Sequence, residues 1–145
     1  MATTAHQIYR GVNADMKTIT DKKVAGAYLP GTFCTSSATT LTQSTTAAGR
    51  QFLLANREFM GQSIADAYPS GDTAEVYELI PKEPYVARFA AATYTFGQEL
   101  TIAASGRLAA AASTNIVVGF YTGSGVALSA GDLDDFVSAD QYVKA

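Results

Sequence analysis

The feature that most constrains the fold of this chain is a series of short apolar runs separated by turn signals. Apolar runs of this length, interrupted by Gly, Pro, Ser and Asp, are typical of β-strands joined by tight turns. A regular succession of such strands favours a barrel or a sandwich. The runs are 51–55, 75–80, 85–90, 99–103 and 115–121, and the turn signals are 69–72, 96–98, 105–106 and 123–125.

The side-chain pattern predicts how these elements face the core. Run 85–90 alternates, which is typical of a strand with one buried face, whereas 115–121 is apolar on both faces. Met60, Ile64 and Tyr68 recur at helical spacing, so we expect one short helix near 60–68. The sequence therefore predicts a mainly β fold, a small β-barrel or sandwich of short antiparallel strands with an extended N-terminal arm.

Charge is distributed unevenly along the chain. Only 16% of the residues are charged, against about 25% in a typical globular domain, and the stretches 24–49 and 108–131 hold no charged residue. Charged residues are depleted in the cores of protein interfaces. Both stretches are therefore candidates for contact with other chains. A flexible Ser/Thr loop at 35–49 and a buried strand at 115–121 are the alternatives. We expect two units: residues 1–49, an N-terminal arm with an uncharged Ser/Thr-rich segment, and residues 50–145, a β-barrel domain.

Composition and charge exclude several classes of protein. A chain with 48% hydrophobic residues and a net charge of −3 is unlike a disordered chain, and no apolar run approaches the 18 residues of a membrane span. Residues 1–23 carry a net charge of +2, too little for useful nucleic-acid binding. We expect no signal peptide, because no basic stretch precedes an apolar one at the start. Cys34, as the sole cysteine, fits a reducing cytoplasm.

The search for chemistry predicts no catalytic, cofactor-binding or metal-binding residue, and no enzyme. His6 is the sole histidine and has no neighbouring ligand, and Cys34 is interpreted as a small buried thiol rather than a nucleophile. The acidic segment 131–135 lacks the Gly bend and distal Glu of a calcium loop, so it is interpreted as a solvated turn. Glu75 and Glu78 would point to opposite faces of a straight strand, which argues against an acid/base pair.

Five segments of the chain together match a known sequence pattern: 70–81, 85–89, 94–100, 105–108 and 116–120. They resemble the capsid decoration (cement, or head-stabilising) proteins of tailed bacteriophages, whose small domain is a β-barrel called a β-tulip. The resemblance covers about 50 residues well and residues 51–145 loosely. Within it, Gly97 and Gly106 are expected to form the turns into and out of strand 99–103. Gly119 is expected at a bend or close approach in a central strand.

The resemblance implies a viral structural protein that binds the outer surface of the phage head as a homotrimer. It would be made in the bacterial cytoplasm, stabilise contacts between major capsid subunits, and need no cofactor, nucleic acid or membrane. We assign trimer contacts in part to 108–131 and capsid contact to 1–49. The expected capsid anchors are aromatic and Arg side chains, which dominate interface hot spots: Tyr9, Arg10, Tyr28 and Phe33. The alternatives are a tail, baseplate or receptor-binding module and, after these, a carbohydrate-binding domain or an enzyme.

Overall fold

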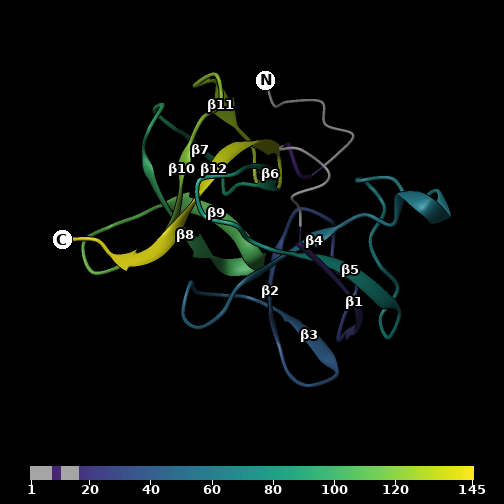
Figure 1. Cartoon of the computed structure of the whole chain (residues 1–145). Helices are drawn as coiled ribbons and strands as arrows, with labels where there is room; N and C mark the ends of the chain where they lie inside the picture. The colour runs from purple at the N-terminus through teal and green to yellow at the C-terminus, as the bar shows by residue number, and fades with distance from the viewer. Residues whose placement is uncertain (1–7, 11–16) are drawn as a thin grey trace.

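The computed structural model describes residues 8–10 and 17–145, and within them the chain is mainly β, as predicted. Two sheets dominate the fold, a closed five-stranded barrel and a curved five-stranded sheet beside it (Figure 1). The only helical elements in the described residues are two short 3₁₀ turns, η2 (Glu58–Met60) and η3 (Ala104–Gly106). The short helix expected near 60–68 is absent: η2 ends at Met60, because Gly61 adopts the left-handed conformation (φ 75°), and residues 61–68 form turns and irregular chain.

The barrel is built from the first five strands, in the order β1-β3-β2-β4-β5. β1 closes it, pairing parallel with β3 on one side and antiparallel with β5 on the other. The boundary expected at residues 49/50 therefore falls inside the barrel, because three of its strands come from 17–43. The strands are β1 (Lys17–Val24), β2 (Phe33–Ser36), β3 (Thr40–Gln43), β4 (Phe52–Ala55) and β5 (Thr73–Glu78).

The second sheet has the strand order β6-β12-β10-β8-β9. A bridge between Phe89 and Leu108, in which the amide of Ala90 donates to the Leu108 carbonyl (2.8 Å), brings its two outer strands together. A two-stranded ribbon of β7 (Ala92–Thr93) and β11 (Ala127–Leu128) accompanies it. The strands of the sheet are β6 (Pro84–Arg88), β8 (Glu99–Ala103), β9 (Arg107–Ala110), β10 (Ile116–Tyr121) and β12 (Leu133–Val143).

Residues 8–10 extend this sheet rather than forming a free arm. Tyr9 bridges Tyr85 of β6 in antiparallel fashion, and the amide of Arg10 donates to the Pro84 carbonyl at 3.0 Å. Ile8 and Tyr9 are 1% and 2% exposed. A buried residue that also completes the backbone pairing of an edge strand belongs to the core, so the described part of segment 1–49 is an integral part of the fold.

The core has two parts. The smaller part fills the barrel, where Cys34, Leu41 and Val76 are buried together. The larger part lies between the barrel and the sheet and is rich in aromatic rings. Tyr9 lies 5.1 Å from Tyr85 and 6.0 Å from Tyr77 between ring centroids. Because Tyr77 belongs to β5 and Tyr85 to β6, these contacts join the two sheets into one packed unit.

The glycines singled out in the sequence lie at turns and close contacts. Gly97 (φ 83°) occupies the turn before β8, and its amide donates to the Tyr121 carbonyl at 2.7 Å. Gly106 (φ 63°) presses against the backbone of Phe33 in β2. Gly119 lies at a register shift between β10 and β12, where a Cβ would come within 2.5 Å of the Val137 carbonyl oxygen. Gly106, where η3 packs on β2, and Gly119, where β10 meets β12, therefore mark places where two backbone segments approach too closely for a side chain.

Candidate functional site

The two uncharged stretches of the sequence meet at one groove on the surface. The groove encloses about 550 Å³ between the β3–β4 loop of the barrel and the outer strands of the sheet. Its lining residues carry no charge. Ala47 (4% exposed) and Ile102 (3%) are its most buried members, whereas Ala48 and Ala110 are exposed. We call this the uncharged groove; it is lined by 46–48, 101–103, 109–110 and 114–116.

Burial explains part of the missing charge. Within the two uncharged stretches, Phe33, Leu41, Leu108 and Val117 are fully buried in the chain's own core. A charge at such a position would be costly in any protein. The exposed positions around the uncharged groove have no such explanation. The absence of charge at these exposed positions is typical of the core of an interface between chains.

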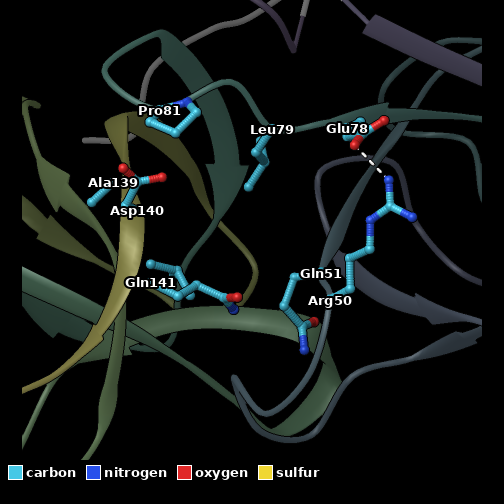
Figure 2. A pocket seen from close by; sticks show the side chains of 9 residues that line it. Arg50, Gln51, Glu78, Leu79, Pro81, Ala139, Asp140 and Gln141 are labelled. Atoms are coloured by element: carbon cyan, nitrogen blue, oxygen red, sulfur yellow. Dashed lines mark hydrogen bonds and ion pairs between the residues drawn. The ribbon is translucent and has the colours of Figure 1, made fainter.

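A second, smaller cavity of about 160 Å³ lies between the barrel and β12 (Figure 2). Its polar side chains are engaged with one another. Arg50 Nη2 contacts Glu78 Oε1 at 2.5 Å, and Gln141 Nε2 donates to the carbonyl oxygens of Ala47 (3.2 Å) and Gly49 (3.1 Å). The Gln141 bonds fasten the β3–β4 loop to β12 and the Arg50 pair fastens it to β5, so these contacts hold in place the loop that forms one wall of the uncharged groove.

Cys34 lies in the barrel core and is completely buried, in agreement with its interpretation as a small buried thiol. Burial raises the pKa of its thiol to about 12, because the charged thiolate is disfavoured away from water. His6 lies outside the described residues. Among the residues that the structure describes, no group of three His, Cys, Asp or Glu side chains is placed to hold a metal ion.

The thiol of Cys34 gives a direct test of the barrel. In the folded chain at pH 8, we expect an aromatic disulfide reagent to leave Cys34 unmodified for as long as the barrel stays closed. Addition of guanidinium chloride should release one thiol equivalent per chain, in step with the loss of the β circular-dichroism signal. Rapid labelling of the native chain would contradict the burial of Cys34.

The acidic segment 131–135 is not a solvated turn throughout, which corrects the sequence-based interpretation. It runs into β12, where Asp134 is 1% exposed. The Tyr121 hydroxyl donates to Asp134 Oδ2 at 2.8 Å, and the backbone amide of Asp135 donates to Asp134 Oδ1 at 2.8 Å. The hydroxyl and the amide satisfy the buried carboxylate. Asp132 alone keeps the turn role, accepting the Ser129 amide at 2.8 Å.

The glutamates considered for acid/base chemistry serve separate contacts. Glu78 pairs with Arg50, and Glu83 Oε2 accepts the Tyr9 hydroxyl at 3.4 Å. Burial, followed by the nearby charge of Glu58, raises the pKa of Glu75. The carboxylates of Glu75, Glu78 and Glu83 therefore do not converge on one another in the contacts of the described residues.

The four residues expected to anchor a partner do not form one surface. Tyr9 and Phe33 are buried in the core, 2% and 0% exposed, so neither offers its side chain to another protein. Tyr28 is half-buried against the barrel core. Arg10 is exposed and pairs with Asp135, its Nε lying 3.3 Å from Oδ1. The assignment of Tyr9 and Phe33 as contact residues is therefore wrong, because the fold itself needs their rings.

Three large apolar side chains are exposed that the sequence does not mark as contact residues, although Met60 is part of the helix expected near 60–68. Phe59 is 77% exposed, Met60 65% and Phe96 73%. The adjacent pair Phe59 and Met60 sits between Glu58 and Gly61 and matches no strand pattern. That mismatch is the one signal in the sequence that could have separated this pair from the core.

No protein family and no curated protein matches this chain. In the described part of the chain, no helix has the length and apolar character that a membrane crossing requires.

Proposed function

We propose that this protein is a structural component of a tailed-phage head. It binds the outer surface of the capsid as a homotrimer and stabilises the contacts between major capsid subunits. The uncharged groove is the surface that covers, or is covered by, a segment of the major capsid protein. The proposal is supported by the resemblance of residues 70–120 to decoration proteins and by the exposed neutral lining of the groove.

The observation that carries the proposal is the meeting of 46–48 with 109–116 in one place. These segments come from different sheets and are separated in sequence, yet both are uncharged where they face solvent. An extended capsid segment lying in the groove would contact both sheets at once. Small side chains would let its backbone approach closely, and no ionised group would have to be desolvated.

A trimer suits this role because of multivalency. Three weak contacts presented by one rigid particle act together, and the effective concentration of the second and third contacts raises avidity by about 10²–10⁴. Such a particle can hold neighbouring capsid subunits against internal pressure even where each groove alone binds weakly.

Expanded phage heads that lack their decoration protein provide the test. We expect the purified chain to co-sediment with them and Ala48→Glu to weaken this binding by at least about tenfold, because an unpaired charge would be buried in the contact. Ala91→Glu is the matched control: Ala91 is also exposed, but it lies outside the groove and outside both uncharged stretches. Equal binding by both variants would contradict the assignment of the groove.

The location of the protein separates this proposal from the nearest alternative. Negative-stain images of virions carrying a labelled chain should show label over the head, at a copy number near that of the major capsid protein. Label confined to the tail or baseplate would overturn the capsid role and favour a tail or receptor-binding module.

A further inference from the structure

Between β4 and β5 the chain makes a long excursion, residues 56–72, that carries η2 away from the two sheets (Figure 1). At its end, Phe59 is 77% exposed and Met60 65% exposed. We call these two side chains the apolar tip. Two adjacent large apolar side chains exposed at the end of a loop are typical of a contact with another protein.

The base of the excursion is held firmly in place. Gln62 Oε1 accepts two bonds from Arg57, from the backbone amide at 2.9 Å and from Nε at 3.1 Å. Asn56 Nδ2 donates to the Gln62 carbonyl at 3.0 Å, and the Arg57 guanidinium lies 4.6 Å from the Tyr68 ring centre. The apolar tip is thus presented in a fixed position, which lowers the entropy cost of binding.

The surroundings of the tip are acidic. Residues 57–75 hold one basic and four acidic side chains, a net charge of −3, which equals the net charge of the whole chain. The basic residue, Arg57, is paired with Asp72 at 3.3 Å and is largely buried. Glu58, Asp66 and Glu75 therefore set the local field, and a complementary surface would be apolar with basic side chains around it.

The same chain carries such a surface on the barrel. A groove of about 520 Å³ lies between β1, β2 and β4, with Ile19 and Phe52 as its apolar members. Lys22 and Arg50 line it as cations. Lys22 lies 3.7 Å from Asp21, the one acid of the lining, and Arg50 is paired with Glu78 outside it at 2.5 Å. We call it the basic groove. Arg50 lies over the Phe52 ring at 4.9 Å from its centre, and its side chain is 66% exposed.

The tip and the basic groove lie at opposite ends of one strand. Phe52, at the start of β4, lines the groove, whereas Ala55, at its end, leads into the excursion. Four residues of strand span about 13 Å. A chain therefore presents its own tip away from its own groove, and the tip and groove can engage only between different copies.

We propose that the apolar tip of one copy docks in the basic groove of the next copy, in a head-to-tail contact. Contacts of this kind generate a closed ring when the rotation between copies closes. The proposal deepens the trimeric assembly argued above and rests on that part of the proposed function. Each copy inserts its own tip into one neighbour and receives the tip of another. In each contact Phe59 and Met60 are the apolar anchors, and Arg50 of the groove faces Glu58 of the incoming tip.

The first experiment compares exposed apolar side chains by sedimentation velocity over a range of concentrations. We expect the wild-type chain to self-associate and the tip variant F59S/M60S to associate at least about tenfold more weakly. Phe96→Ser is the matched control, because Phe96 is 73% exposed and lies outside the excursion. Circular dichroism checks that each variant is folded. A tip variant that associates like the wild type, or a wild-type chain that stays monomeric, would overturn the proposal.

A mixing experiment tests the head-to-tail geometry. The groove variant Arg50→Gln, which removes the cation without placing a carboxylate beside Glu78, should be monomeric on its own, as should F59S/M60S. An equimolar mixture contains one intact groove and one intact tip, so it should form 1:1 heterodimers and no larger species. A mixture that stays monomeric contradicts the proposal.

Head binding separates this proposal from the proposed function. If the wild-type chain is monomeric yet co-sediments with expanded heads, the tip-to-groove contact falls and the capsid role stands. If the tip and groove variants dissociate the trimer as described but the wild-type trimer does not bind expanded heads, the tip-to-groove contact is supported and the capsid role is contradicted.

Discussion

A chain that begins at residue 24 is expected to lose its fold. The deletion removes β1, the strand that pairs with both β3 and β5 to close the barrel. It also removes Ile8 and Tyr9 from the core. Burial of one large apolar side chain contributes about 1.5–3 kcal/mol, and a whole domain is stable by only about 5–15 kcal/mol. The deletion loses the burial of these two side chains and the hydrogen bonds of β1, and it exposes two strand edges. The summed loss of stability is expected to exceed the whole free energy of unfolding.

Circular dichroism and thermal denaturation measure the outcome. We expect chain 24–145 to show a weakened β signal without a cooperative melting transition, and to aggregate through the unpaired edges of β3 and β5. The control is a chain that begins at residue 8, which keeps Ile8, Tyr9 and β1 and is expected to melt cooperatively. A stable, cooperatively folded chain 24–145 would show that β1 and the Tyr9 contacts are dispensable.

Within the same region, Tyr9→Ala isolates the contribution of one ring. Removal of a buried aromatic side chain costs about 3–5 kcal/mol when the cavity cannot collapse. Because Tyr9 touches Tyr77 of the barrel and Tyr85 of the sheet, the loss should loosen the joint between the two sheets. A urea denaturation midpoint close to that of the wild type would contradict this role.

The predictable part of the fold lies where the apolar pattern is simple. The run at 99–103 coincides with β8, and those at 85–90 and 115–121 overlap β6 and β10. The runs located these strands, but not which faces they bury. In β6 the consecutive residues Tyr85, Val86 and Ala87 are all buried, so this strand is covered on both faces and the expectation of one buried face is wrong. Which faces are covered depends on tertiary packing, which the local pattern does not contain.

The strands that the pattern did not reveal have physical reasons for being hidden. β1 is rich in charge, and a register shift between Ile19 and Lys22 breaks the alternation by which a strand is recognised. Asp134 looks solvated in the sequence because its hydrogen-bond partner, Tyr121, lies on a different strand. Burial of an acid can be recognised only when its partner is known.

The candidate surfaces, too, could be predicted from the sequence only in part. The uncharged stretches 24–49 and 108–131 were visible as compositional features, but only the fold brings 46–48 beside 109–116. The basic groove combines β1, β2 and β4, and no local motif joins them. The exposure of Phe59 depends on how the ends of the excursion are fastened, through Arg57 and Gln62.

Replacement of Gly106 by Ala should destabilise the protein by about 2–5 kcal/mol, for two separable reasons. The residue has φ 63°, a conformation that costs an L side chain about 1–2 kcal/mol. Its Cβ would also lie 2.6 Å from the Phe33 carbonyl oxygen and 2.9 Å from the Phe33 nitrogen. The backbone atoms of Phe33, at the start of β2, cannot turn aside as a flexible side chain can, so overpacking adds about 1–3 kcal/mol.

Two other glycines separate these contributions by thermal denaturation. Gly71 has φ 89° and open space around it, so Gly71→Ala reports backbone strain alone. Gly119 has no positive φ, but its Cβ would lie 2.5 Å from the Val137 carbonyl oxygen, so Gly119→Ala reports the contact alone. We expect Gly106→Ala to lower Tm more than Gly71→Ala does, by at least about 4 °C. Equal decreases in Tm for Gly106→Ala and Gly71→Ala would mean that η3 can move away from β2 without a loss of stability. That result would contradict the close packing of η3 on β2.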